Sequence, residues 1–368
     1  MEKIVRTILD LISIPSVSGN EAEISKALSY VQDFFSEDNA NIHCFEYDEA
    51  SPVLLVSNSQ SDDFDLLMVG HLDVVPAKEE QFFPQVTEDR IYGRGSNDMK
   101  SQIAIAMYVL RDVIREKTPL KVGLLITTDE ETTSNGIKAF KKNEKITSKI
   151  VLDIDAGSLK TIIEKYKHSV GVKLYGHGKS GHSSRPWQSE NAINNLLKVI
   201  LELQKTFPEY SEKLPQPKET WLDTMVVTYI TSKQTSNVVP DFVEANLNFR
   251  LTEKTSLEEL EKLLAEVCEK NNTTYKIDMA SCGCYMDANS PEIQNYKKIA
   301  EKIAGDKISI THMNGATDAR MFADNSVIIM HSTTGANVHG DGEYVETDSI
   351  FKLYEIQKAY IQKLVEEK

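Results

Sequence analysis

The chain has 368 residues, enough for roughly two or three domains of ordinary size. Its 41 Lys and Arg against 56 Asp and Glu give a formal net charge of −15 at pH 7, which argues against a nucleic-acid-binding protein and against adhesion to an anionic membrane. With 40% hydrophobic and 26% charged residues, the composition is that of a globular protein and excludes wholesale disorder.

The N-terminal segment, the apolar runs and the cysteines indicate the cellular compartment of the protein. The start, MEKIVRTILDL, is typical of an amphipathic helix rather than a signal peptide, and no apolar run reaches the roughly 18 residues of a membrane span. The four cysteines do not make a disulfide framework, and we expect Cys282 and Cys284 to be small residues on one face of a strand rather than ligands. The sequence therefore predicts a cytoplasmic protein without a membrane partner.

Helices and strands alternate in the first part of the chain. A helical pattern covers residues 1–35 and is interrupted by the turn-forming PSVSGN. Short apolar runs predict buried strands at 52–56, 65–69 and 122–127. Residues 101–116 predict a helix between the second and third of these strands. This order indicates an α/β layer with a parallel or mixed sheet covered on both faces, in which ligands bind beyond the carboxyl ends of the strands.

The pattern changes at about residue 167 and changes back after residue 280. The intervening order is β-α-β-β-α-β, which is typical of a small α+β sandwich of the ferredoxin-like kind. Its predicted elements are strands near 170–174, 225–231 and 243–251 and helices at 190–204 and 256–270. We therefore expect a domain at 167–280, inserted into a catalytic α/β domain made of residues 1–166 and 281–368. The chain should end in a helix over 350–365.

Acids and histidines follow several of the predicted strands. In MVGHLDVVP, His71 and Asp73 lie two apart at a strand end, so the carboxylate can share a face with the imidazole and orient it. In LLITTDEE a strand runs into Asp129, Glu130 and Glu131, whose repulsion must be relieved by a cation or by water. Each motif alone is weak, because a lone histidine is more often a core residue and an acidic strand end is more often a solvated loop.

Three further motifs extend this set. Asp98 lies in the glycine-bearing loop of IYGRGSNDMKS and leads into a helix, where an N-terminal helix cap is the alternative interpretation. KIVLDIDAGS ends a strand in Asp153 and Asp155, and GANVHGDGEYV places His339 in a glycine-rich turn. Imidazoles and carboxylates at successive strand ends suit zinc or a related divalent ion.

The motifs GHLDVVP, YGRGSNDMKS, TTDEE, LDID, GHSSRP and ANVHGDGE occur in this order along the chain. Together they resemble the dinuclear zinc amidohydrolase family that contains succinyl-diaminopimelate desuccinylase, acetylornithine deacetylase, aminoacylase, glutamate carboxypeptidase and several di- and tripeptidases. The resemblance covers residues 5–365 approximately. It implies a mixed-sheet, zinc-exopeptidase-like catalytic domain with two Zn²⁺ per chain, Co²⁺ or Mn²⁺ being alternatives.

Carried over position by position, the resemblance implies that Asp98 bridges the two ions. His71 and Asp155 would complete one site, and Glu131 and His339 would complete the other.

The resemblance also implies that Asp73 orients His71 and that Glu130 is the general base. The residues support the same interpretation, because a metal-bound water has a depressed pKa and an adjacent unligated carboxylate can take its proton. One position departs from the deacylase pattern: the deacetylases, desuccinylases and carboxypeptidases have glutamate where this chain has Asp155. The di- and tripeptidase branches have aspartate there, which favours a peptidase without excluding a deacylase.

The inserted segment begins with GHGKSGHSSRP, which resembles the family's lid and dimerisation domain. In dimeric relatives the histidine that matches His182 reaches the partner's active site and stabilises the tetrahedral oxyanion, a task that suits a preorganised imidazole donor. The alternative is a histidine hydrogen-bonded within its own turn.

Two more segments match family segments near the substrate. In SNVVPDFVEANLNFRL the matching residues are Asn237 and Arg250, and the guanidinium suits a substrate carboxylate unless it pairs with Glu253 or another acid. In NGATDARMF, Gly315 and the backbone of Thr317 would line the pocket, whereas the neighbouring Asp and Arg could equally form an internal ion pair.

The sequence thus predicts a homodimeric two-zinc hydrolase that cleaves the amide bond of a short peptide or N-acyl amino acid, with an exopeptidase favoured. An N-acyl amino acid deacylase is the alternative. A noncatalytic metal- or ligand-binding relative would need a broken motif, yet every metal and base position is filled. A hydrolase with a cysteine nucleophile lacks a Cys beside a plausible base.

Overall fold

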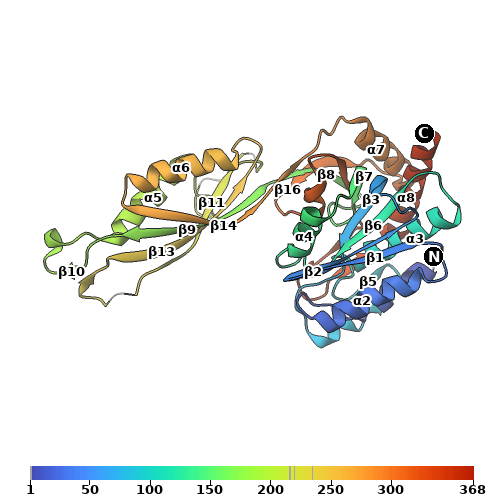
Figure 1. The fold of residues 1–368 in the computed structure, drawn as a ribbon, viewed down its shortest axis with the longest axis horizontal. Coiled ribbons are helices and arrows are strands. Elements are labelled where there is room, and N and C mark those ends of the chain that lie inside the picture. The colour runs from blue at the N-terminus through green and yellow to red at the C-terminus, as the bar shows by residue number, and fades with distance from the viewer. Residues whose placement is uncertain (1, 215–216, 219, 234) are drawn as a thin grey trace. The chain divides into compact units, whose positions relative to one another are not determined.

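Two compact units account for the described residues. The computed structural model describes residues 2–214, 217–218, 220–233 and 235–368. Unit 1 consists of Met1–Glu164, Met286–Thr311 and Thr317–Lys368, and unit 2 consists of Lys165–Tyr285 and His312–Ala316. Unit 1 is therefore assembled from both ends of the chain, as the blue and red ribbons of Figure 1 show.

A mixed sheet forms the centre of unit 1. Its spatial order is β1 (Asn41–Tyr47), β2 (Ala50–Ser57), β6 (Val122–Thr127), β3 (Asp63–His71), β7 (Thr147–Asp153), β17 (Val327–Met330) and β8 (Thr161–Tyr166), with β16 (Ser309–Met313) paired to β8. β15 (Cys284–Tyr285) pairs with Lys165 and Tyr166 at the end of β8, and these residues belong to unit 2. β3 runs parallel to β6 and β7, and β7 runs parallel to β17. Because carboxyl ends of parallel strands meet at one edge, the residues that follow β3, β6 and β7 are brought together there.

Helices cover both faces of this sheet. They are α1 (Glu2–Ile12), α2 (Glu21–Phe34), α3 (Lys100–Arg115), α4 (Asn135–Asn143), α7 (Pro291–Ala304) and α8 (Thr347–Glu366). Strand side chains alternate: Met68 and Leu124 belong to the core cluster shared with α1, α3 and α8, whereas their neighbours Leu67 and Leu125 are buried outside it. The strands are therefore almost continuously apolar, which is the pattern of a sheet buried on both sides.

A small second sheet holds two functional loops together. It has the order β18 (Gly335–Ala336), β19 (Tyr344–Glu346), β5 (Arg90–Tyr92) and β4 (Gln85–Val86), with short helical turns η1 (Glu79–Phe82) and η3 (Asp318–Phe322) elsewhere in unit 1. β5 leads into the loop that carries Asp98, and β19 follows the loop that carries His339. Pairing of β5 with β19 therefore joins segments from the two ends of the chain.

Unit 2 has the β-α-β-β-α-β order. Its elements are β9 (His168–His177), α5 (Ala192–Thr206), β11 (Thr224–Thr231), β13 (Phe242–Leu251), α6 (Leu257–Glu269) and β14 (Thr273–Ser281), and the antiparallel sheet has the order β11-β13-β9-β14. Val172 and Leu247 of the sheet share one core with Leu196 of α5 and Leu264 of α6. Both helices lie on the same face (Figure 1), so the unit is a two-layer α+β sandwich. A short pair, β10 (Gly181–His182) with β12 (Val238–Val239), and the turn η2 (Pro186–Gln188) complete it.

The predicted fold class is confirmed, with one local expectation wrong. Cys282 is exposed and lies between β14 and β15, whereas Cys284 is buried within β15. The two do not share one strand face because β14 ends at Ser281. No disulfide joins the cysteines in the described part of the chain. Among the helices of the described residues, none combines the length and the apolar character needed to cross a membrane.

Candidate metal centre

His71 is the first element of the candidate site. It is the last residue of β3 and is 1% exposed. Its Nε2 lies 3.1 Å from Oδ1 of Asp98 and 3.6 Å from Oδ1 of Asp155, which follows β7. The three ligand atoms lie within 4.8 Å of one another, close enough to hold one metal ion.

A second ligand group shares Asp98 with the first. The Nε2 atom of His339 lies 3.2 Å from Oδ2 of Asp98 and 2.9 Å from Oε2 of Glu131, and these atoms again lie within 4.8 Å of one another. Asp98 therefore turns one carboxylate oxygen toward each histidine. The other oxygen of Glu131 is buried and has no hydrogen-bond partner among the described residues. Such an orphaned oxygen fits a site that takes a cation.

The helix-cap alternative for Asp98 is wrong. The N-terminal cap of α3 is Met99, and the carboxylate of Asp98 points to the two histidines instead. The peptide bond between Asp98 and Met99 is cis.

Asp73 links the histidine to the acidic turn after β6. Its backbone oxygen lies 2.9 Å from Nδ1 of His71, and its Oδ1 lies 3.4 Å from the same nitrogen. The carboxylate also accepts the backbone N–H groups of Glu130 and Glu131, each at 3.2 Å, and the hydroxyl of Ser18 at 2.6 Å. Asp73 is fully buried, so its contacts fix both the ring of His71 and the backbone of the two glutamates. Ser18 was not singled out from the sequence, because a serine in a turn carries no motif.

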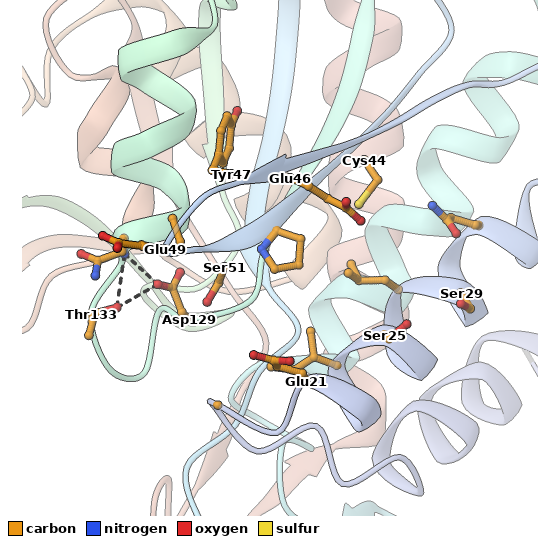
Figure 2. Close-up of a pocket in the computed structure, with 17 residues that line it drawn as sticks. Glu21, Ser25, Ser29, Cys44, Glu46, Tyr47, Glu49, Ser51, Asp129 and Thr133 are labelled. Atoms are coloured by element: carbon orange, nitrogen blue, oxygen red, sulfur yellow. Dashed lines mark hydrogen bonds between the residues drawn. The ribbon is translucent and has the colours of Figure 1, made fainter.

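The three acids after β6 have different surroundings. Asp129 turns its carboxylate to the start of α4, where it accepts the N–H of Asn135 at 2.7 Å and of Gly136 at 3.2 Å, and the hydroxyl of Thr133 at 2.9 Å. It also lines a separate cavity of about 580 Å³ between α2 and the β1–β2 hairpin (Figure 2). The cavity shares no lining residue with the two ligand groups. Asp129 therefore satisfies the first N–H groups of α4, whose N-cap residue is Ser134, and this leaves Glu130 and Glu131 for the site.

The buried carboxylates of the site repel one another, and a bound cation would stabilise them. Burial and the charge of Asp155 raise the pKa of Glu130 well above its usual range. Burial and the charge of Asp98 raise the pKa of Glu131 to about 7. Although burial favours a neutral imidazole, Asp155 raises the pKa of His71. Clustered buried carboxylates repel one another unless a cation compensates them, and His nitrogens with carboxylate oxygens are donors that zinc and related divalent ions accept. The residues therefore fit two neighbouring divalent ions.

His182 is the last residue of β10, and Asn237 directly precedes β12, the strand of unit 2 that pairs with β10. His182 is exposed, and its Nδ1 lies 2.8 Å from the hydroxyl of Ser184 and 3.2 Å from the backbone nitrogen of the same residue, which is the pattern of a histidine bonded within its turn. The backbone oxygen of Asn237 accepts the N–H of Ser183 at 3.0 Å, and its side-chain oxygen accepts the hydroxyl of Thr235 at 3.1 Å.

Arg250 does not pair with Glu253. Glu253 instead lies 3.4 Å from Nζ of Lys165 and accepts the indole N–H of Trp221 at 2.8 Å. Within the described ranges of the chain, Arg250 has no ion-pair partner, and burial lowers its pKa. A half-buried guanidinium without an acidic partner remains able to take a substrate carboxylate.

The segment around Thr317 is tied to the sheet of unit 1. The hydroxyl of Thr317 donates to Oδ2 of Asp153 at 2.6 Å, and both residues are buried. Asp318 lies 3.9 Å from Nη1 of Arg320, so the internal ion-pair alternative for these two residues is confirmed. Gly315 lies in the loop between β16 and η3, where an added Cβ would lie 3.4 Å from the Cε of Met313.

Comparison with known proteins gives consistent matches. The family model described as Peptidase family M20/M25/M40 matches residues 67–363. A curated relative, succinyl-diaminopimelate desuccinylase of Wolbachia pipientis subsp. Culex pipiens (strain wPip), is 28% identical over 314 residues, which is 81% of this chain and 78% of the relative.

Two solved structures share the fold. Aminopeptidase PepT from Bacillus cereus has a TM-score of 0.77 at 19% identity. The match covers 99% of this chain and 98% of the PepT chain. The M20 family metallo-carboxypeptidase Sso-CP2 from Sulfolobus solfataricus has a TM-score of 0.78 at 19% identity. The match covers 98% of this chain and 99% of the Sso-CP2 chain.

Proposed function

Because this chain belongs to peptidase family M20/M25/M40, and so is a metal-dependent hydrolase, we propose that it cleaves the amide bond of short peptides as an exopeptidase of the di- or tripeptidase kind. One observation carries the proposal. Asp98 lies between two histidine–carboxylate groups and turns one oxygen toward each. A shared carboxylate of this kind is suited to two metal ions a few ångströms apart.

The proposed ligands follow from these two groups. Asp98 would bridge two Zn²⁺ ions, with Co²⁺ or Mn²⁺ as alternatives. His71 and Asp155 would complete one site, and Glu131 and His339 the other. When bound, the ions would supply a water of depressed pKa and would polarise the scissile carbonyl.

Glu130 is the proposed general base. It belongs to neither ligand group in the described part of the chain, yet it precedes the ligand Glu131 and its backbone N–H is held by Asp73. Its carboxylate would take the proton of the attacking water and return it to the leaving amine.

Residues of several segments would contact the substrate. Arg250, which has no acidic partner within the described ranges, would bind a carboxylate of the peptide, and Asn237 would lie near it. Gly315 and the backbone of Thr317 would line the pocket. Asp155, in place of the glutamate of the deacylases, favours a peptide substrate.

A second candidate is supported by the curated relatives. The Wolbachia protein that matches 81% of this chain is named succinyl-diaminopimelate desuccinylase, and so is a relative from Ehrlichia canis (strain Jake). An N-acyl amino acid deacylase would use the same metal ions and the same Glu130, because both reactions hydrolyse an amide. Only the groups that flank the scissile bond would differ.

We also propose that residues 167–280 form a lid and dimerisation domain inserted between the catalytic parts 1–166 and 281–368. The edge strand β11 of this segment exposes Val226, Tyr229 and Ile230, which a second copy of the chain would cover. In the homodimer, His182 would stabilise the oxyanion in the partner's active site.

A substrate screen tests the choice between peptide and acyl amino acid. The zinc-loaded protein would be assayed against dipeptides, tripeptides, N-acetyl amino acids and N-succinyl amino acids. We expect cleavage of di- or tripeptides. Cleavage confined to the N-acyl compounds would replace the peptidase by the deacylase.

A further inference from the structure

The carboxylate of Glu343 is buried against the loop that carries Asp98. Its side chain is 0% exposed. Oε1 accepts the backbone N–H groups of Asn97 at 2.9 Å and Asp98 at 3.1 Å, while Oε2 accepts the N–H of Gly95 at 3.2 Å and an N–H of the Arg94 guanidinium. A carboxylate has about four acceptor positions, and all of them are used here.

The same contacts reach the loop that carries His339. The second terminal nitrogen of Arg94 donates to the backbone oxygen of Gly340 at 3.3 Å, and the N–H of Gly93 donates to the backbone oxygen of Glu343 at 3.1 Å. Arg94 is 3% exposed, so its charge is compensated by Glu343 within the protein. The Arg94–Glu343 pair thus joins the Asp98 loop to the residue that follows His339.

We propose that Glu343, with Arg94, is a positioning residue that holds Asp98 between the two metal ions and sets its distance from His339. The inference rests on the proposed two-metal centre. Neither residue belongs to a ligand group among the described residues, and both oxygens of Glu343 accept backbone or guanidinium N–H groups. Glu343 acts through the backbone N–H of Asp98, whose carboxylate is the shared ligand.

The geometry predicts unequal effects on the two sites. The Glu131 and His339 site depends on the pair twice, through Asp98 and through the loop of His339. The His71 and Asp155 site depends on it only through Asp98, because its other two ligands belong to β3 and to the segment after β7. Loss of Glu343 should therefore weaken the first of these sites more than the second.

Glu343→Gln is the direct perturbation. The side chain keeps its size, but one oxygen becomes an NH₂ group that faces backbone N–H donors, so at least one of those donors loses its acceptor. The matched control is Asp38→Asn, because Asp38, like Glu343, is a carboxylate of unit 1 with a buried side chain. It pairs with Arg111 at 3.1 Å and with Arg115 at 2.7 Å. Asp38 contacts neither ligand group, so its loss should change stability without changing metal affinity.

The experiment measures Zn²⁺ affinity of the full chain by competition with a chromophoric chelator, without any substrate. His71→Ala and His339→Ala backgrounds isolate each site. We expect Glu343→Gln to weaken Zn²⁺ binding by about 10- to 100-fold in the His71→Ala background, and by clearly less in the His339→Ala background. Asp38→Asn should leave both affinities unchanged. If Glu343→Gln does not fold, as judged by circular dichroism, Arg94→Lys removes the contact with Gly340 and should give the same asymmetry.

The outcomes separate this inference from the proposed function. If the parent protein bound two Zn²⁺ and Glu343→Gln bound them equally well, the positioning role would be wrong while the two-metal centre stood. An equal loss at both sites, or the same loss in Asp38→Asn, would show a purely structural role and would also overturn the inference. If the parent protein bound no divalent ion, the metal centre and the positioning role would fall together.

Discussion

Substitution of Glu130 by Gln separates catalysis from metal binding at one position. Gln preserves the size of the side chain and the backbone N–H bond to Asp73, but it cannot accept a proton. Because Glu130 belongs to neither ligand group among the described residues, we expect both ions to be retained. A positioned general base contributes about 10²- to 10⁴-fold to a rate, or about 3–5 kcal/mol of transition-state stabilisation. The expected result is therefore a loss of kcat of at least about 100-fold with little change in KM.

The neighbouring acid provides the control. Asp129→Asn makes the same chemical change one residue earlier, where the carboxylate caps α4 instead of facing the site. Loss of this cap should cost about 1 kcal/mol of stability and leave kcat near that of the parent. The assay measures initial rates, metal content and urea unfolding for both variants. A Glu130→Gln protein that turns over as fast as the parent with both ions bound would refute the role of Glu130.

Three further outcomes are expected. His331 is buried with Tyr296 and the backbone of Leu159 at its ring nitrogens, and burial lowers its pKa from the ordinary 6.5 to about 4. In the unfolded chain His331 therefore binds a proton as the pH falls from 6.5 to 4, whereas in the folded chain it stays neutral. The free energy of unfolding of the parent, measured with urea, should fall by about 3 kcal/mol relative to that of His331→Gln over this window. Asp73→Asn removes an acceptor from the N–H of Glu130 or Glu131 and should weaken Zn²⁺ binding about 10- to 100-fold, measured by chelator competition; unchanged affinity would contradict its orienting role. Mixing inactive Glu130→Gln and His182→Ala subunits should restore activity in hybrid dimers, and no recovery among hybrids shown to form would exclude donation of His182 across the interface.

The site residues at strand ends could be predicted from the sequence, because apolar runs mark the strands that precede them. β3 and β7 each contain a short apolar run, at 66–69 and 150–152, before the site residues. Because parallel strands bring the residues that follow them to one edge of the sheet, the approach of His71 and Asp155 can be expected without knowing the loops. The bridging position of Asp98 came from family resemblance, and no periodicity would have distinguished it from a helix cap.

Other features depend on contacts between distant segments. β1 (Asn41–Tyr47) is an edge strand with mixed exposure, so it lacks the alternation that marks a strand. α4 is short, and its first N–H group donates to the carboxylate of Asp129, which lies six residues before Asn135. A search for a capping residue directly before the helix therefore does not find Asp129. Glu343 follows His339 by only four residues, yet its partners lie near residue 95, and only the folded chain brings them together.

Metal stoichiometry tests the central claim most directly. After removal of metal with a chelator and reloading with Zn²⁺, mass spectrometry of the desalted protein should find about two ions per chain. Asp98→Asn should lose both, because each ligand group includes one oxygen of Asp98. A single ion per chain in the parent protein, or two ions retained by Asp98→Asn, would contradict a dinuclear centre bridged by this carboxylate.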